Sequence, residues 1–506
     1  MTINANRILF VTGLILAACA WLPAATLPAV QEQQLGNWPT NGGGVIAASQ
    51  DGSHVAWTVK DGSTNTLVVD GKPQPIYQRY EYVTFSPDGK RVASYGLKGD
   101  KWFMVVDGKE EWSFNVSGVV PGNPLMPVVF SADGTRWAFM EPKGNVSAMV
   151  VDGKEGPDYG LIDDVQVNEP IFSPDGKHFA YIAHKGQKHV LVMDGVEGKE
   201  YESSGQFVFS SDSQHWWYFP RNRWAWYMVA DGKESPAYDD ISGIVFSANK
   251  EVGAFAATNF VAGKNMKKIL TTNGIEGPSF DDLDRPILSN DGQRLAYRAF
   301  SNDRWIIVLD GKEHPEFGDS PRVIFSPDGK RMAYIKPQDG KFWAVVDGNV
   351  DTAFDNVRDV IFSPDGSGVA YVLNKNKGKY SVVFNGKEGM DYDQGGGNQP
   401  PIFSPDGKHL AFVGQKDGKY VMVVDGQGQA EYNLIYGRGP IFSADGKHTA
   451  YSAALGKKRV VVLDGNQGPE YNTIMGEPAF GPDGALYYSA VRDNALYRVK
   501  QPQVEQ

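Results

Sequence analysis

Short apolar runs alternate with turn signals along almost the whole chain. In residues 325–348, for example, the apolar run 332–335 is followed by a turn signal at 337–340 and by a second apolar run at 342–346. Runs of this length bounded by Gly, Pro and Asp predict β-strands. Because these runs have no polar face, each hairpin must be covered on both sides. The pattern predicts strand meanders that pack against one another.

Two turns delimit each meander. Residues 326–329 (Ser-Pro-Asp-Gly) suit a type I turn, because Pro327 presets the backbone and Gly329 takes the left-handed position. The pair Asp347 and Gly348 suits a two-residue hairpin turn. The first-turn Asp or Asn recurs at Asp51, Asp88, Asp133, Asp175, Asp212, Asn249, Asp291, Asp328, Asp365, Asp406, Asp445 and Asp483. The second-turn Asp or Asn recurs at Asp70, Asp107, Asp152, Asp194, Asp231, Asn273, Asp310, Asp347, Asn385, Asp425 and Asp464.

The chain therefore holds twelve copies of one unit, with a period of roughly 39 residues, which matches four strands per blade of a β-propeller. We label the four strands A to D from the inside outward. The repeat F-S-P-D-G-K-x-x-A-Y with V-V-D-G resembles the WD-related repeat of TolB-type β-propellers, found in many exported bacterial proteins. The resemblance covers about residues 40 to 500 and implies the fold and export. TolB itself has an α/β domain ahead of its propeller, for which residues 30–50 leave no room, so a role in the Tol-Pal system is not implied.

The predicted fold class is all-β, with twelve four-stranded blades. Propellers usually have four to eight blades, so twelve copies favour two tightly packed six-bladed rings, residues 37–283 and 284–500. The most eroded copies lie near the middle of the chain, which places the boundary near Asp284. One oversized ring and a 7+5 split are the alternatives. The last copy lacks a D strand, and the segment near Gln33 is a candidate to pair there and close a ring.

Composition narrows the class of partner. The chain of 506 residues is 41% hydrophobic and 12% aromatic, enough for sizeable cores. Its formal net charge of −11 argues against nucleic acid, which needs a basic footprint. The only cysteine, Cys19, excludes an intramolecular disulfide and structural Cys-based metal sites.

The first residues have the pattern of an export signal. Arg7 precedes the apolar run 8–22, which is short for a membrane span, and small residues follow up to Ala29. Residues 1–29 are therefore the predicted signal peptide, and the protein is expected in the periplasm or cell envelope. Leu-Ala-Ala-Cys at 16–19 also resembles the bacterial lipobox, which implies a lipid anchor on Cys19. Ordinary signal-peptidase cleavage between Ala20 and Ala29 is the alternative.

Two further repeat positions favour structural roles. An aromatic residue always stands seven after the second-turn Asp, as at Tyr77 and Phe114, and a position filled in every copy indicates packing between blades. Five of the eight histidines share one repeat position with four arginines, as His215 does with Arg331, and this sharing argues against catalysis.

One face is the candidate working surface. The spacing between the two turn residues is 19 in nine of eleven copies, whereas the D-to-A connections and one B-to-C loop vary in length. Both open on the same side of a meander, and variable loops on a rigid scaffold are where binding normally resides. On that side the fifth copy reads HWWYFPRNRWAWYMV. Trp with Arg is typical of binding hot spots. The candidate binding residues are Trp217, Arg221, Arg223, Trp224 and Trp226, with a local packing cluster as the alternative.

The start of each A strand predicts a polar channel mouth. Three residues before the repeat Phe stand Glu169, Arg285, Arg322, Asp359 and Glu477. This set is a candidate for binding a small polar ligand, and solvated channel lining is the alternative.

No enzyme signature stands out. The chain has no H-E-x-x-H, nucleophile elbow, phosphate loop or dinucleotide fingerprint, and its Asp-Gly pairs lack the ligand series of a calcium loop. We therefore expect no metal and no cofactor. The preferred hypothesis is an exported, non-catalytic propeller that binds a protein or glycan through its variable loop face. The alternative is a propeller lyase or hydrolase with its site at the channel mouth.

Overall fold

The fold is known from a computed structural model of the whole chain. It describes residues 29–37, 46–120, 125–160, 171–261, 264–314, 323–350, 354–375, 378–393, 400–437 and 439–502. The predicted β-propeller of twelve four-stranded blades is confirmed. No helix in these ranges is long and apolar enough to cross a membrane.

The first six blades run in chain order. Blade 1 is β2 (Ile46–Ala48), β3 (Val55–Asp61), β4 (Thr64–Val69) and β5 (Lys72–Tyr77); blade 2 is β6 (Arg79–Phe85), β7 (Val92–Lys98), β8 (Lys101–Val106) and β9 (Lys109–Asn115), followed by the 3-10 helix η1 (Val116–Gly118); blade 3 is β10 (Val129–Phe130), β11 (Trp137–Lys143), β12 (Val146–Val151) and β13 (Lys154–Tyr159). Blade 4 is β14 (Ile171–Phe172), β15 (Phe179–Lys185), β16 (Lys188–Met193) and β17 (Val196–Tyr201); blade 5 is β18 (Phe207–Phe209), β19 (Trp216–Tyr218), β22 (Val229–Ala230) and β23 (Lys233–Glu234), with β20 (Arg221–Asn222) and β21 (Ala225–Trp226) as a separate pair; blade 6 is β24 (Asp240–Phe246), β25 (Gly253–Val261), β26 (Lys264–Thr271) and β27 (Glu276–Phe280).

The last six blades continue in the same order. Blade 7 is β28 (Asp282–Leu283), β29 (Ile287–Leu288), β30 (Leu295–Ser301), β31 (Arg304–Leu309) and β32 (Lys312–His314); blade 8 is β33 (Ile324–Phe325), β34 (Met332–Gln338), β35 (Lys341–Val346) and β36 (Asn349–Val350); blade 9 is β37 (Asn356–Phe362), β38 (Val369–Lys375), β39 (Lys379–Phe384), β40 (Lys387–Glu388) and β41 (Tyr392–Asp393). Blade 10 is β42 (Ile402–Phe403), β43 (Leu410–Lys416), β44 (Lys419–Val424) and β45 (Gln427–Tyr432); blade 11 is β46 (Leu434–Ile435), β47 (Ile441–Phe442), β48 (Thr449–Leu455), β49 (Lys458–Leu463) and β50 (Asn466–Gln467); blade 12 is β51 (Thr473–Phe480), β52 (Leu486–Arg492), β53 (Ala495–Gln501) and β1 (Gln31–Asn37).

Side-chain hydrogen bonds explain why the two turns define each blade. In blade 8 the Ser326 hydroxyl donates to Asp328 Oδ1 at 2.6 Å, and Gly329 has a φ of 68°. Asp347, with a φ of 51°, accepts the backbone N–H of Met332 at 3.0 Å. The Asp side chain thus replaces a backbone partner at each turn, which fixes the register of the strands.

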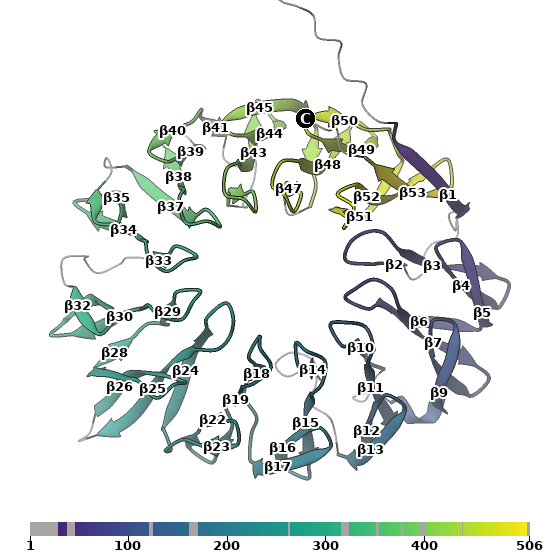
Figure 1. Ribbon diagram of the computed structural model, residues 1–506, viewed down its shortest axis with the longest axis horizontal. Helices are drawn as coiled ribbons and strands as arrows, with labels where there is room; N and C mark the ends of the chain where they lie inside the picture. Colours follow the sequence, from purple (N-terminus) through teal and green to yellow (C-terminus); the bar gives the residue numbers. More distant parts are fainter. Residues whose placement is uncertain are drawn as a thin grey trace, which may run out of the picture.

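The preferred arrangement of two six-bladed rings is corrected by the structure, which shows the alternative of one ring (Figure 1). At the expected boundary, Phe280 and Leu283 pack with Tyr297 of blade 7 in one buried cluster. Blade 12 packs on blade 1 through Leu496 and Trp57. Each blade therefore covers the next, and no break occurs at Asp284.

The first strand closes the ring, as the segment near Gln33 indicated. Strand β1 pairs antiparallel with β53, so the last blade takes its outer strand from the start of the described chain (Figure 1). Glu32 forms an ion pair with Arg492 at 2.6 Å and accepts a hydrogen bond from the Tyr471 hydroxyl. Arg498 of β53 contacts Asp70 of blade 1 at 2.5 Å. Blade 12 is thus bonded to both of its neighbours.

The aromatic repeat position packs between blades, as predicted. Tyr77 is 2% exposed, and its hydroxyl donates to Glu110 of the next blade at 2.7 Å. Tyr201 in blade 4 makes the same contact with Glu234 of blade 5 at 2.6 Å. Burial excludes this position from any exposed ring of stacking aromatics.

The shared His and Arg position is a structural clip. Arg331 Nε donates to Asp347 at 2.7 Å, and its Nη1 donates to the Gly366 carbonyl oxygen of the next blade at 3.0 Å. His215 Nδ1 lies 2.8 Å from Asp231 Oδ2 in the same position. Because arginine and histidine make the same contact, these His-carboxylate pairs belong to the scaffold.

Candidate functional site

We define the loop face as the side that carries the D-to-A connections and the B-to-C turns. The Gln78 N–H, after the D strand of blade 1, donates to the Leu97 carbonyl of blade 2 at 2.8 Å. The Glu202 N–H makes the same bond to the Arg221 carbonyl at 3.0 Å, between blades 4 and 5. Each connection is thus bonded beside the B-to-C turn of the following blade, which places both on one face.

Blade 5 departs from the regular ladder on this face. Its B strand β19 spans only three residues, because Pro220 lacks the N–H that would continue the ladder. The pairing resumes in the same register in β20 and β21, which form the end of the B-to-C hairpin. Arg221 bridges to Ser203 on one side, and Trp226 bridges to Tyr238 on the other. The hairpin is therefore held at its base by both neighbouring connections.

The backbone around this hairpin is tightly packed. A Cβ on Gly205 would lie 2.0 Å from the Phe219 carbonyl oxygen, so no larger residue fits there without displacing the chain. The Phe219 N–H in turn donates to the Gln206 carbonyl at 3.1 Å. This close approach fixes where the hairpin leaves the blade.

The tip of the hairpin consists of Arg223 and Trp224. The Trp224 side chain is 87% exposed, the most exposed large apolar side chain of the described chain. Arg223 has a φ of 51°, a left-handed conformation that costs a non-glycine residue about 1–2 kcal/mol. The residue with positive φ at the same turn position is glycine in five other blades (Gly62, Gly99, Gly144, Gly186 and Gly456) and Asn or Asp in others, among them Asn302, Asp339 and Asp417. Asn and Asp tolerate this conformation better than Arg does.

Charges surround the exposed indole. The Arg223 N–H donates to Glu202 Oε2 at 2.6 Å, and its guanidinium lies 4.0 Å from the same carboxylate. The Arg221 guanidinium lies 5.5 Å from the centre of the Trp226 ring, a cation–π contact. Trp226 itself is half-buried. Arg221, Arg223 and Trp224 thus form an exposed patch, which we call the tip patch.

Trp217 does not belong to this patch, and its expected role in binding is corrected. It is 4% exposed and packs with Phe255 and with Phe246, whose ring centre lies 5.5 Å from its own. Phe246 also lies against Gly253, whose lack of a side chain leaves space at the blade interface. Phe246 occupies that space, and Trp217 packs on Phe246 as a core residue.

The three predicted channel-mouth residues that the structure describes do not meet in one place. Glu169 and Arg322 lie outside the described residues. Arg285 and Glu477 are exposed and Asp359 is half-buried, on blades 7, 12 and 9, none of which is next to another. Glu477 lines a cavity of only about 60 Å³ between blades 11 and 12. The described members of the set form no shared ligand site.

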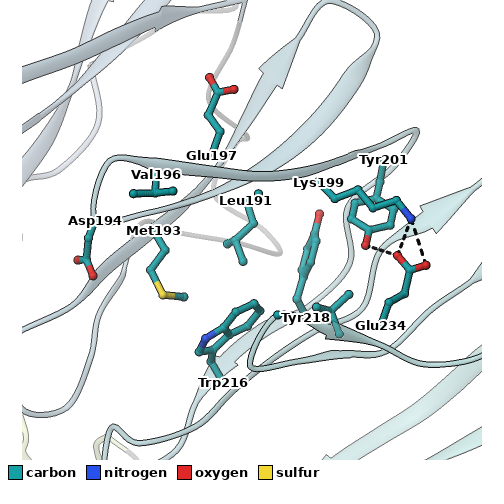
Figure 2. A pocket seen from close by; sticks show the side chains of 13 residues that line it. Leu191, Met193, Asp194, Val196, Glu197, Lys199, Tyr201, Trp216, Tyr218 and Glu234 are labelled. Atoms are coloured by element: carbon teal, nitrogen blue, oxygen red, sulfur yellow. Dashed lines mark hydrogen bonds and ion pairs between the residues drawn. The ribbon is translucent and has the colours of Figure 1, made fainter.

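Sequence reasoning missed a larger pocket, of about 550 Å³, between blades 4 and 5 (Figure 2). Its signal was present in the repeat. Val196 stands two after the second-turn Asp, where six blades have Lys. Lys199 stands five after it, where six blades have Pro. Both departures fall in β17 and line the pocket.

Histidines elsewhere give no metal centre. His184 and His189 face each other across the B-to-C hairpin of blade 4, with ring centres 4.1 Å apart, and His189 Nδ1 lies 2.8 Å from the Ser204 hydroxyl. No group of three or more His, Cys, Asp or Glu side chains suited to a metal ion occurs among the residues whose placement is described.

Comparisons with known proteins gave matches among solved structures only. No family model matches the chain, and no curated protein does. Among solved structures, a eukaryotic initiation factor is similar with a TM-score of 0.36 and 12% identity, over 80% of this chain and 97% of the other. TolB from Acinetobacter baumannii is similar with a TM-score of 0.25 and 12% identity, over 62% and 80%. The β-propeller domain of the Trilobed protease from Pyrococcus furiosus gives 0.27 and 14%, over 53% and 94%.

Proposed function

We propose that the protein is a non-catalytic propeller that binds a protein or glycan partner through its loop face, with the tip patch of Arg221, Arg223 and Trp224 as the central contact. The ring supplies a rigid frame, and blade 5 presents the patch on a hairpin bonded to both neighbouring connections. Trp and Arg are enriched at binding hot spots because they combine a large contact area with directional polar groups.

The observation that carries the proposal is the composition of the turn itself. Glycine would remove the strain at position 223, and a polar residue would remove the exposed apolar surface at position 224. Blade 5 has Arg and Trp instead, so both choices cost stability in the isolated ring. Such local costs are characteristic of residues kept for contact with a partner.

The alternative of a propeller enzyme has less support. The His-carboxylate pairs that would favour it recur as clips around the ring, as at His178 with Asp194, and Arg takes the same place in other blades. The described channel-mouth residues are dispersed over blades 7, 9 and 12.

Export to the periplasm or cell envelope, and the TolB-type character of the repeat, form part of the same proposal. They rest on the signal pattern of residues 1–29 and on the repeat motif. Cys19, the candidate lipidation site, lies outside the described residues, as do all but Ala29 of the predicted signal. The partner is accordingly expected in the envelope.

The test compares partner recovery by wild type and variants from an envelope extract, with a glycan array in parallel. Trp224→Ala should weaken binding at least about thirtyfold, equivalent to 2 kcal/mol or more. Lys457→Ala, at the same turn position in blade 11, is the matched control and should bind like wild type. Equal recovery by wild type, Trp224→Ala and a Trp224→Ala, Arg223→Ala double variant would refute the assignment of the tip patch.

A further inference from the structure

A second candidate site lies away from the tip patch, in the gap between blades 4 and 5. The pocket of about 550 Å³ is lined on one side by Leu191, Met193 and Val196 and on the other by Trp216 and Tyr218 (Figure 2). This volume falls within the range of about 300–1,000 Å³ typical of small-molecule sites. Neither the tip patch nor the channel mouth contributes a residue to it.

The pocket exists because blade 5 does not fill the space beside Gly198. In four other blades the D strand carries glycine at this position, and in three of them the Tyr hydroxyl of the next blade packs against it. The distance from the glycine's Cβ position to that oxygen is 3.6 Å for Gly156 and 3.0 Å for Gly277. Beside Gly198 only the Leu191 carbonyl lies within 4 Å, so the equivalent Tyr218 does not reach it. Gly389 in blade 9 also lacks this contact, but there Phe412, which has no hydroxyl, takes the place of the Tyr. Between blades 4 and 5 the Tyr is present and still leaves the space beside Gly198 open.

The charged groups around the pocket are already paired within the protein. Asp194 Oδ2 lies 2.7 Å from His178 Nδ1, and Glu197 accepts a hydrogen bond from Lys185 at 2.7 Å. That bond from Lys185, with one from the Tyr159 hydroxyl, holds the pKa of Glu197 below its usual value. An added ionic ligand would have to break one of these pairs.

At the other end of the pocket, Lys199 donates to Glu234 at 2.8 Å, and the Tyr201 hydroxyl donates to the same carboxylate at 2.6 Å (Figure 2). Burial alone would raise the pKa of Glu234, but these two hydrogen bonds outweigh it and lower the pKa. The Lys199 ammonium also lies 5.3 Å from the centre of the Tyr201 ring. This end is polar and internally satisfied, whereas the rest of the lining is mostly apolar.

We propose that the pocket binds a neutral, largely apolar small molecule, seated on Leu191, Met193 and Trp216, with any polar end directed at Lys199 and Glu234. Apolar contact supplies the binding free energy, because roughly 25 cal/mol is gained for each Å² of apolar surface removed from water. Neutral ligands are selected because every charge in the lining already has a partner.

Val196 forms the lip of this site. Its side chain is 71% exposed, and exposing a branched apolar side chain to water is unfavourable. Most other blades carry Lys or another polar residue at this position. Ile275 occupies the same repeat position in blade 6, is 63% exposed and does not line the pocket. The pair therefore offers a variant and a matched control.

The experiment uses the full chain and N-phenyl-1-naphthylamine, a neutral probe whose fluorescence rises in apolar surroundings. Wild type should bind it saturably at one site, and Val196→Asp should weaken binding about tenfold or more, because a carboxylate at the lip must lose water when the probe enters. Ile275→Asp and Trp224→Ala should both bind like wild type. The last variant separates this site from the proposed partner surface.

Three results would overturn the proposal. They are the absence of saturable probe binding by wild type, equal losses in Val196→Asp and Ile275→Asp, and tighter binding of the anionic analogue 8-anilinonaphthalene-1-sulfonate than of the neutral probe. Circular dichroism melts of each variant establish that the ring is folded. Because Val196 and Ile275 are both exposed, neither substitution should change the melting temperature by more than a few degrees.

Discussion

Blades 8 and 5 have the same sequence repeat but use it differently. In blade 8 the B and C strands pair without interruption from Ala333 and Val346 to the Asp339 and Gly340 turn. In blade 5 the pairing is interrupted at Phe219 and Pro220 and resumes in the same register in β20 and β21, whose turn is Arg223 and Trp224. The difference teaches that the two turns and the blade interfaces suffice for the scaffold, so the B-to-C turn can carry residues other than turn residues.

The comparison of blades 5 and 8 assumes that their interiors pack in the same way and that only the B-to-C turn differs. Trp217→Ala should destabilise the ring by about 3–5 kcal/mol, because the substitution leaves a cavity against Phe246. Tyr334→Ala in blade 8, at 5% exposure, should cost a similar amount. Urea unfolding measures both. A loss below about 1 kcal/mol for Trp217→Ala would show that blade 5 does not share the scaffold's packing.

A smaller effect on the free energy of unfolding is expected at the B-to-C turn of blade 5. Arg223→Gly should raise the free energy of unfolding by about 1 kcal/mol, because glycine adopts the left-handed conformation without the steric penalty of arginine. The same substitution should weaken partner binding. Gly186→Arg, at the equivalent turn of blade 4, is the reverse control and should lower stability by a similar amount. Destabilisation by Arg223→Gly would contradict the view that this turn is strained.

The smallest expected effect on stability concerns the side-chain contacts of His215 with Asp231 in blade 5 and of Arg331 with Asp347 in blade 8. The hydrogen bond to Asp231 raises the pKa of His215, so its stabilising contribution is full below the unfolded pKa of about 6.5 and is lost as pH rises through the folded pKa. Because the imidazole is half-exposed, the effect is a fraction of roughly 1 kcal/mol. The difference in stability between wild type and His215→Gln should therefore shrink from pH 6 to pH 9. Arg331→Gln in blade 8 should give a difference independent of pH over that range.

Most of the fold could be predicted from the sequence, because it depends on hydrogen bonds between residues that are close in sequence. The Ser326 and Asp328 turn and the Asp347 and Gly348 turn each carry their own hydrogen-bonding groups, so twelve copies predict twelve blades. The number of rings could not be predicted in this way. It depends on the small rotation between neighbouring blades, which is set by how whole faces pack, as Phe280 packs with Tyr297.

The candidate site was only partly predictable. The exposed position of Arg223 and Trp224 followed from a turn without turn residues. Trp217 could not be placed from its own segment, because its burial depends on Phe246 and Phe255 in the next blade. The pocket likewise could not be predicted, because it depends on a contact that Tyr218 of blade 5 does not make with Gly198 of blade 4. Neither repeat alone shows whether its residues contact the neighbouring blade.

The pairing of β1 with β53 has a consequence for how the protein is made. Gln31 pairs with Lys500, so β1 must wait until the segment around Lys500 has been synthesised before it finds its partner. Contacts this distant in sequence form slowly, because closing a long loop costs conformational entropy before the favourable contacts are made. The edge of blade 1 and the open side of blade 12 stay exposed until then. The ring therefore closes only after residues 495–501 have been synthesised.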